Sequence, residues 1–218
     1  MSETLESMPE HERKLSIVGL GGSLGGTSRS RAALQVALDG AAEAGAETLL
    51  LDLQELDLPM FDPDHEQPIG SAERLVEECY RADGMLWSSP LYQGTISGAF
   101  KNALDWLHVL GRREPPFLHD KVIGLISAAG GVHGLQGINT MEFSVRALRG
   151  WAVPYVVPVA GAHGAFDDEG QVRDPNVRAQ LETLGAEVVR VAARFAADDA
   201  LHRLSECDEA ADRVAAAI

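Results

Sequence analysis

The sequence has few cysteines and no long hydrophobic run, and both shortages exclude classes of protein. Cys79 and Cys207 are the only cysteines in 218 residues, and the absence of a CxxC pair argues against an iron–sulfur or zinc site. No apolar run reaches the roughly 20 residues that cross a bilayer. Residues 1–14 are polar and acidic, without the apolar core of a signal peptide. We therefore expect a cytoplasmic protein that does not insert into membranes.

Positive charge is scarce as well. The chain has 18 Lys and Arg against 33 Asp and Glu, for a formal net charge of -15, and its only lysines are Lys14, Lys101 and Lys121. Nucleic acids and anionic lipid surfaces both attract basic faces, so neither is expected as a partner. The hydrophobic fraction of 45% is ordinary for a soluble globular chain, and the length suits one well-buried domain.

Apolar segments alternate with amphipathic ones, which predicts an α/β fold with a parallel sheet. Five strands are expected, at residues 15–20, 48–51, 84–88, 121–127 and 151–159. Helices are expected at residues 30–44 and 140–149, after Ser71 and Ser97, and from Pro175, where Asp174 can act as the N-cap. Residues 1–14 should form a flexible tail, residues 15–197 the domain, and residues 198–218 an acidic helical tail.

A polar, glycine-rich turn follows the first expected strand and leads into the first expected helix. Its sequence over residues 21–30 is GGSLGGTSRS. A strand, a loop of this composition and a helix aim backbone N–H groups at an anion. Hydroxyl groups and one guanidinium add further donors. The candidate phosphate ligands are Ser23, Thr27, Ser28, Arg29 and Ser30.

Two other phosphate-binding patterns do not fit this turn. The Rossmann fingerprint needs a glycine where Leu24 stands, and the P-loop needs a lysine where Thr27 stands. A hydroxyl-rich loop with one arginine suits a terminal monophosphate, such as that of FMN, better than a diphosphate or triphosphate. The remaining alternative is a glycine-rich turn that binds no ligand.

Two more loops of unusual composition follow strands, at the sheet edge where ligands bind in doubly wound folds. They are SSPLYQGTISG at residues 88–98 and SAAGGVHG at residues 127–134. A flat ring and its side chain would lie between these loops. The candidate contacts are Pro90, Leu91, Tyr92, Gln93, Gly94 and Thr95 on one side, and Ala129, Gly130 and Gly131 on the other.

Together these motifs resemble those of the NADPH-dependent FMN reductase family. GS at residues 22–23 with SRS at residues 28–30 is similar to its phosphate loop, and PLY at residues 90–92 with SGAFKNALDW at residues 97–106 looks like its second signature. The AGG of residues 129–131 resembles its third loop. The resemblance implies a flavodoxin-like sheet of order 2-1-3-4-5 with helices on both faces. It also implies FMN, and NADPH or NADH, as cofactors.

The same resemblance implies an activity and an assembly. The activity is hydride transfer from NAD(P)H to FMN, and the variant of the first loop looks like the reductase components that supply monooxygenases, such as the alkanesulfonate system. The assembly is a homodimer or homotetramer, with the helix of residues 97–107 at the interface. Two alternatives stay open: an FMN-containing reductase of quinones, azo dyes or metal oxyanions, and a flavodoxin-like electron carrier that is not an enzyme.

No side chain is predicted to be catalytic, because the flavin itself carries the hydride chemistry. His133, in the third loop, could meet a nucleotide phosphate or a flavin carbonyl, or could equally face solvent. The other histidines considered lack the spacing of metal ligands, so no metal site is predicted. They are His65, His108, His119 and His163.

Overall fold

The computed structural model describes residues 13–64, 67–167 and 169–215. Most of the predicted N-terminal tail, residues 1–12, lies outside the described residues. A single sheet has the order β2-β1-β3-β5-β6, with parallel neighbours throughout, and the short β4 pairs antiparallel with β3. The strands are β1 (Ser16–Gly21), β2 (Glu47–Asp52), β3 (Gly84–Tyr92), β4 (Thr95–Ile96), β5 (Val122–Ala128) and β6 (Trp151–Val159).

The predicted fold class is confirmed, and the number of strands is corrected from five to six. The five long strands are adjacent in the predicted order, and β4 is the addition. It arises because β3 does not end at Ser88 but continues to Tyr92 and then turns back. Gln93 and Gly94 have positive φ angles of 50° and 83°, which allow this tight hairpin.

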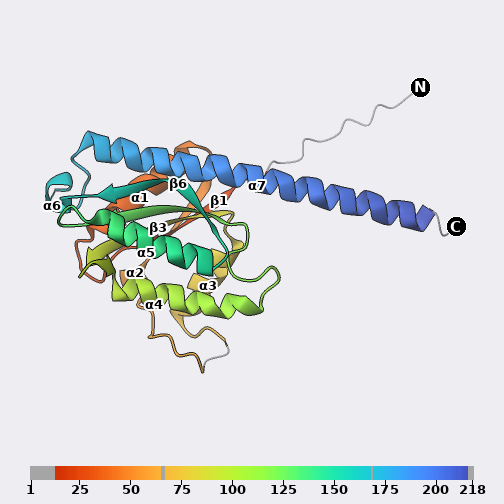
Figure 1. The fold of residues 1–218 in the computed structure, drawn as a ribbon, viewed down its shortest axis with the longest axis horizontal. Helices are drawn as coiled ribbons and strands as arrows, with labels where there is room; N and C mark the ends of the chain where they lie inside the picture. The colour runs from red at the N-terminus through yellow and green to blue at the C-terminus, as the bar shows by residue number, and fades with distance from the viewer. Residues whose placement is uncertain (1–12, 65–66, 168, 216–218) are drawn as a thin grey trace.

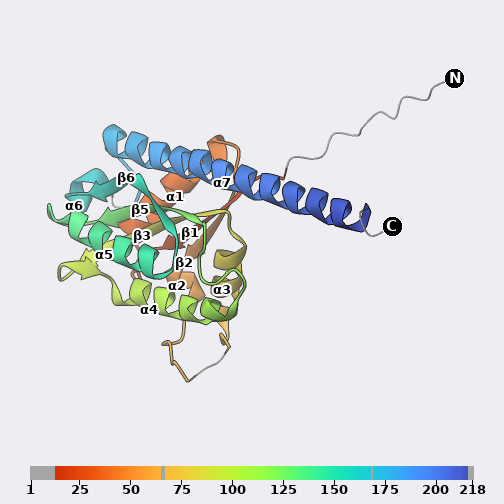
Figure 2. The ribbon, with the colours of Figure 1, turned by 45° about the vertical axis from the view of Figure 1, so that its right-hand side comes forward.

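Two layers of helices enclose the sheet. Helices α1 and α7 cover one face, and α3, α4 and α5 cover the other (Figures 1 and 2). Each layer has its own buried apolar cluster against the sheet, which explains why the central strands are apolar on both faces. The helices are α1 (Arg29–Glu43), α2 (Leu53–Leu56), α3 (Ser71–Arg81), α4 (Gly98–Trp106), the 3₁₀ helix η1 (Leu107–Arg112), α5 (Gly134–Ala147), α6 (Ala162–Ala165) and α7 (Pro175–Ala215).

Helix α7 begins as the sequence predicts and runs further than expected. Asp174 is its N-cap, because its Oδ1 accepts a hydrogen bond from the Asn176 backbone N–H at 2.8 Å. The helix then continues to Ala215 and extends beyond the sheet (Figure 1). The predicted boundary between residues 197 and 198 therefore falls within one helix.

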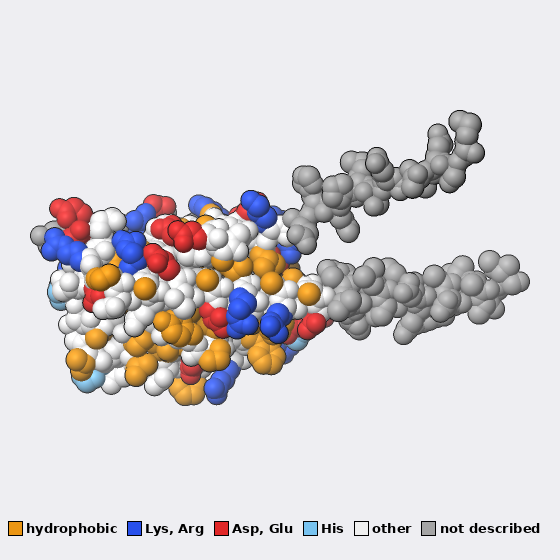
Figure 3. Space-filling model, turned by 90° about the horizontal axis from the view of Figure 1, so that it is seen from above, with side chains coloured by type: hydrophobic (Ala, Val, Ile, Leu, Met, Phe, Trp, Pro, Cys, Tyr) orange, Lys and Arg blue, Asp and Glu red, His pale blue; other side chains and the backbone are white. Residues whose placement is uncertain are grey.

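The face that carries α7 has a mixed surface. Acidic, basic and hydrophobic side chains are interspersed on it, and hydrophobic side chains gather along one side (Figure 3). Trp151, at the start of the edge strand β6, is 56% exposed, and its ring centroid lies 5.7 Å from that of Phe195 on α7.

None of the described helices is both long enough and apolar enough to cross a membrane.

Parallel strands place their carboxyl ends at one edge of the sheet, and the predicted loops meet there. The turn after β1, the hairpin after β3 and the loop after β5 all lie at this edge. The helix after the third loop begins earlier than expected, since α5 starts at Gly134 and not at Thr140. This edge of the sheet is where a ligand site can form.

Candidate functional site

A cavity of about 220 Å³ opens at the carboxyl edge of the sheet. It is smaller than the roughly 300–1,000 Å³ of complete small-molecule sites, so it would enclose only part of a nucleotide-sized ligand. Its walls come from the turn after β1, the start of α1, the ends of β3 and β5, and the segment after β6. The lining residues are Ser23, Thr27, Arg29, Ser30, Pro90, Leu91, Tyr92, Ala128, Gly130, Ala162 and His163.

Local hydrogen bonds shape the turn between β1 and α1. Ser28 caps α1, with its Oγ accepting from the Arg31 backbone N–H at 3.2 Å, and this Oγ lies 3.1 Å from the Ser30 Oγ. The buried Ser88 Oγ donates to the Ser30 carbonyl at 2.8 Å, which ties the start of α1 to β3. Gly22 has a φ of 104°, a conformation in which a side chain would be strained. These contacts hold Arg29 and Ser30 at the N-terminal end of α1.

The donors around the cavity are arranged for an anion. Ser30 is 1% exposed and Ser23 8% exposed, and the Arg29 Nε is buried without a hydrogen-bond partner. A buried guanidinium N–H without an acceptor is costly, so its partner is expected to be a ligand. No Asp or Glu is among the described residues that line the cavity, although the chain has a net charge of -15. The N-terminal end of α1 also lies at this cavity, and the positive end of its helix dipole favours a negatively charged ligand. A phosphate monoester fits this set of donors.

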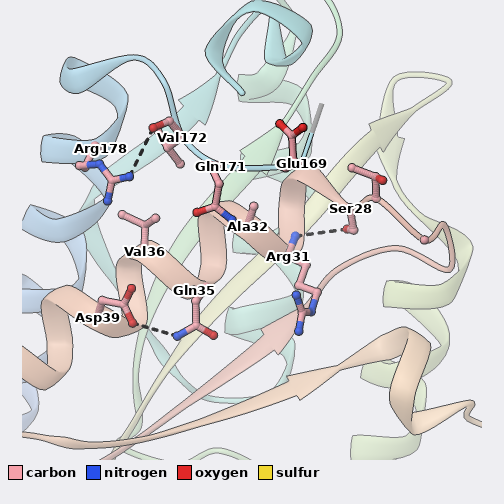
Figure 4. Close-up of a pocket in the computed structure, with 13 residues that line it drawn as sticks. Ser28, Arg31, Ala32, Gln35, Val36, Asp39, Glu169, Gln171, Val172 and Arg178 are labelled. Atoms are coloured by element: carbon pink, nitrogen blue, oxygen red, sulfur yellow. Dashed lines mark hydrogen bonds between the residues drawn. The ribbon is translucent and has the colours of Figure 1, made fainter. Parts of the chain in front are cut away.

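A second cavity of about 200 Å³ lies behind the turn, between α1 and residues 169–172, and it differs in its chemistry (Figure 4). Both of its arginines, and Gln35, pair with protein groups. Arg178 donates to the Val172 carbonyl at 3.3 Å, Gln35 donates to Asp39 at 2.9 Å, and Arg31 forms an ion pair with Asp52 of 2.5 Å. Because these side chains already have partners within the protein, they do not require a bound anion.

The structure brings many of the predicted site residues together and separates others. The cavity is lined by Ser23, Thr27, Arg29, Ser30, Pro90, Leu91, Tyr92 and Gly130, which the sequence predicted. The predicted residues outside its lining are Ser28, Gln93, Gly94, Thr95, Ala129 and Gly131.

The residues outside the lining have visible structural roles. Ser28 caps α1 and faces the second cavity, while Gln93 and Gly94 form the hairpin turn. The Thr95 Oγ1 lies 3.3 Å from the Thr140 Oγ1 of α5. Ala129 is 1% exposed and its backbone N–H donates to the Val159 carbonyl at 2.9 Å.

The sequence analysis did not predict that His163 lines the cavity. It placed His163 among the histidines that lack the spacing of metal ligands. It stands in a Gly-Ala-His-Gly segment, residues 161–164, directly after β6. The same signal, glycines and a polar side chain after a strand, had identified the other loops and could have found this one. Ala128 and Ala162 were missed too, and nothing in their residue type points to a site.

The helical part of the second signature, residues 97–106, serves mainly to build the fold. Asn102 of α4 accepts from the Phe61 backbone N–H at 2.8 Å and donates to the Pro59 carbonyl at 2.9 Å. The Trp106 Nε1 donates to the same carbonyl at 2.8 Å. Lys101 and Asp105 form an ion pair on the surface of α4. This part of the motif therefore anchors the loop after α2 to α4.

Other chemistry is sparse in the described part of the chain. Its residues contain no group of three or more His, Cys, Asp or Glu side chains placed to hold a metal ion. Cys79 is fully buried on α3, and burial raises the pKa of its thiol, so it remains a protonated core residue.

Comparison with known proteins decides the family. The sequence profile of the NADPH-dependent FMN reductase family matches residues 15–164, which include all of the cavity lining. The chain belongs to this family. Its resemblance to these reductases is thereby confirmed, and with it the assignment as an NAD(P)H-dependent flavin oxidoreductase that uses FMN and NADPH.

Curated relatives of this FMN reductase family member carry two kinds of name. An NADPH azoreductase of Bacillus sp. (strain OY1-2) is 29% identical over 63% of the chain and 75% of the relative. The NADPH-dependent FMN reductase ArsH of Acidithiobacillus ferrooxidans is 27% identical over 78% of the chain and 71% of the relative.

Solved structures support the fold of the family member. FerB, a flavoenzyme NAD(P)H:(acceptor) oxidoreductase from Paracoccus denitrificans, aligns with a TM-score of 0.67 at 22% identity, over 83% of this chain and 98% of that one. A flavodoxin, WrbA-like protein from Agrobacterium tumefaciens aligns with a TM-score of 0.57 at 17% identity, over 84% and 99%. At these identities the likeness concerns the flavodoxin-like fold alone.

Proposed function

We propose that this protein reduces FMN with NAD(P)H in the cytoplasm and passes the electrons to a partner monooxygenase or another acceptor. The observation that carries the proposal is the buried Arg29 Nε without a partner, at a helix N-terminus and in a cavity whose described lining residues include no Asp or Glu. It supports binding of the flavin phosphate at this cavity, with Ser23, Thr27 and Ser30 as further donors.

The residues of the chain would bind and position FMN, and FMN would supply the reactive ring. Bound FMN would supply a hydride acceptor, so the reaction requires no acid, base or nucleophile from the protein. Pro90, Leu91 and Tyr92 would support the flavin on the β3 side, and Gly130 on the β5 side, as the cavity walls suggest. Tyr92 is 56% exposed at the cavity mouth, where a ring could cover it.

The absorbance spectrum of the freshly purified protein, before and after adding NADPH without air, tests this function. We expect flavin absorbance that NADPH bleaches, or a colourless protein that oxidises NADPH when free FMN is supplied. The second result would indicate flavin as a released substrate for a partner enzyme. A yellow protein that neither NADPH nor NADH bleaches would contradict the proposal and favour the electron carrier.

A second candidate function is favoured by one comparison. The relative named an NADPH azoreductase suggests an enzyme that keeps FMN and reduces an azo compound. In that case bleached protein should regain its colour on anaerobic addition of an azo dye or a quinone, at a rate that matches steady-state turnover.

We also propose that the protein forms a homodimer through α4 and α5. Phe143 lies on the outer face of α5 and is 72% exposed, a costly position for so large an apolar side chain. Beside it, a groove of about 260 Å³ lies between α4 and α5. Its lining residues are the apolar Leu104, Phe117, Ala147 and Leu148 and the polar Lys101, Asp105, His108 and Ser144. In a two-fold interface, Phe143 of each protomer could fill the groove of the other.

Substitution of Phe143 tests this assembly. We expect Phe143→Asp to convert a dimer to a monomer in size-exclusion chromatography with light scattering. Aspartate removes the apolar ring that would be buried in the groove, and its charge would lose hydration there. Ile69→Asp is the matched control, since Ile69 is also an exposed apolar residue and precedes α3. A monomeric wild-type protein, or a Phe143→Asp variant that is still dimeric, would refute the interface.

A further inference from the structure

His163 lines the cavity from the segment that follows β6. It belongs to α6, which follows β6 through Gly161, a residue with a φ of 57°. Two backbone hydrogen bonds fix this segment to the third loop: the Gly161 N–H donates to the Gly131 carbonyl at 3.0 Å, and the Ala162 N–H donates to the Ala129 carbonyl at 2.9 Å. The position of His163 is therefore set by the fold.

The imidazole is available to a ligand. His163 is exposed, and a Cβ atom added at Gly130 would lie 3.7 Å from its Nε2, which places the ring edge beside the backbone of the third loop. Arg29 and His163 are the lining residues that can carry positive charge. Imidazole offers at least one N–H donor in either of its protonation states, so it can contact an anion whether or not it is charged.

The two side chains come from distant parts of the chain and line one small space. Arg29 starts α1, and His163 follows the edge strand β6. The cavity has a volume of about 220 Å³ and no carboxylate among its described lining residues, so both side chains can offer donors to one anion there. Phosphate oxygens can accept from several directions at once, which suits such an arrangement.

We propose that His163, together with Arg29, binds a phosphoryl group of the reaction's nucleotides. This inference rests on the proposed function. The phosphoryl group can come from the monophosphate of FMN or from the diphosphate of the nicotinamide nucleotide, and binding measurements distinguish the two. His163 would then favour phosphorylated flavin over riboflavin, or set the affinity for the hydride donor.

The test compares wild-type protein with His163→Ala, using FMN and riboflavin as separate ligands in fluorescence titrations. If His163 contacts the phosphate of FMN, we expect the Kd for FMN to rise about 5- to 20-fold and the Kd for riboflavin to stay unchanged. This range corresponds to the loss of one charge-assisted hydrogen bond at a partly exposed site. If His163 instead contacts the diphosphate of the nicotinamide nucleotide, we expect the KM for NADPH to rise by a similar factor while kcat and the Kd for FMN stay constant. His163→Lys, which supplies an N–H donor at the same position, should restore most of either loss.

His119→Ala is the matched control, because His119 is an exposed histidine that pairs with Asp120 ahead of β5, at the other edge of the sheet. If His163→Ala changes none of these constants, or weakens FMN and riboflavin equally, the inference is wrong. Failure of the wild-type protein to bind FMN or to oxidise NADPH would instead refute the proposed function, so the two failures are distinguishable.

Discussion

Arg29→Ala is expected to raise the Kd for FMN about 10- to 100-fold. The Arg29 Nε is buried and lacks a partner within the protein, so a bound phosphate would receive a charge-assisted hydrogen bond from it. Such bonds are worth about 1.5–3 kcal/mol, which corresponds to this range of affinity. Arg29→Lys should recover only part of the loss, because lysine keeps the charge without the planar fork.

Titration of flavin fluorescence against each variant measures the effect, with riboflavin as the ligand that lacks the phosphate. The affinity for riboflavin should be unchanged in Arg29→Ala. Arg178→Ala serves as the control, since Arg178 lines the second cavity and donates to the Val172 carbonyl (Figure 4). An Arg29→Ala variant with wild-type FMN affinity would place the phosphate elsewhere.

Gly185→Ala is expected to destabilise the whole protein, because it separates the two helices that cover one face of the sheet. A Cβ atom at Gly185 of α7 would lie 2.0 Å from the Ala37 carbonyl oxygen of α1, and one at Gly40 of α1 would lie 2.5 Å from the Glu182 carbonyl oxygen of α7. Both conflicts are with backbone atoms, which cannot rotate away.

The expected cost in the free energy of unfolding is about 3 kcal/mol, at the upper end of the range for overpacking. Alanine recovers about 1 kcal/mol of it through its higher helix propensity, so the net loss is about 2 kcal/mol. For a chain of this size, this lowers the Tm by roughly 4–8 °C. Because α1 also carries Arg29, the affinity for FMN should fall as well.

Thermal unfolding followed by circular dichroism gives the Tm, and Gly98→Ala provides the comparison. Gly98 is also helical, at the start of α4, but a Cβ atom added there meets nothing within 4 Å. We expect Gly98→Ala to have a Tm equal to or above that of the wild type. If Gly185→Ala behaves in the same way, α1 and α7 do not need their close contact.

Patterns local to the chain were enough to predict most elements of the fold. The strand predicted at residues 151–159 has the observed bounds of β6, and the predicted N-cap of α7 is formed by Asp174. Both depend on neighbouring residues: a run of β-branched and aromatic side chains in one case, and a carboxylate before Pro175 in the other. The strand β4 escaped prediction because two residues are too few for a period to be recognised.

The candidate site divides in the same way. Residue types and spacing predicted a phosphate-binding turn and ligand loops after β3 and β5. The motifs in these segments resemble those of the family that the sequence profile shows. The contact between the segment of His163 and the third loop arises from the crossover connections that bring separate strand ends to one edge of the sheet. The burial of the Arg29 Nε without a partner and the approach of Gly185 to Ala37 likewise depend on packing between elements far apart in sequence. Packing of this kind produces no periodic pattern in the sequence of either packed segment. Only the tertiary structure therefore places Arg29, His163 and the start of α1 around one cavity.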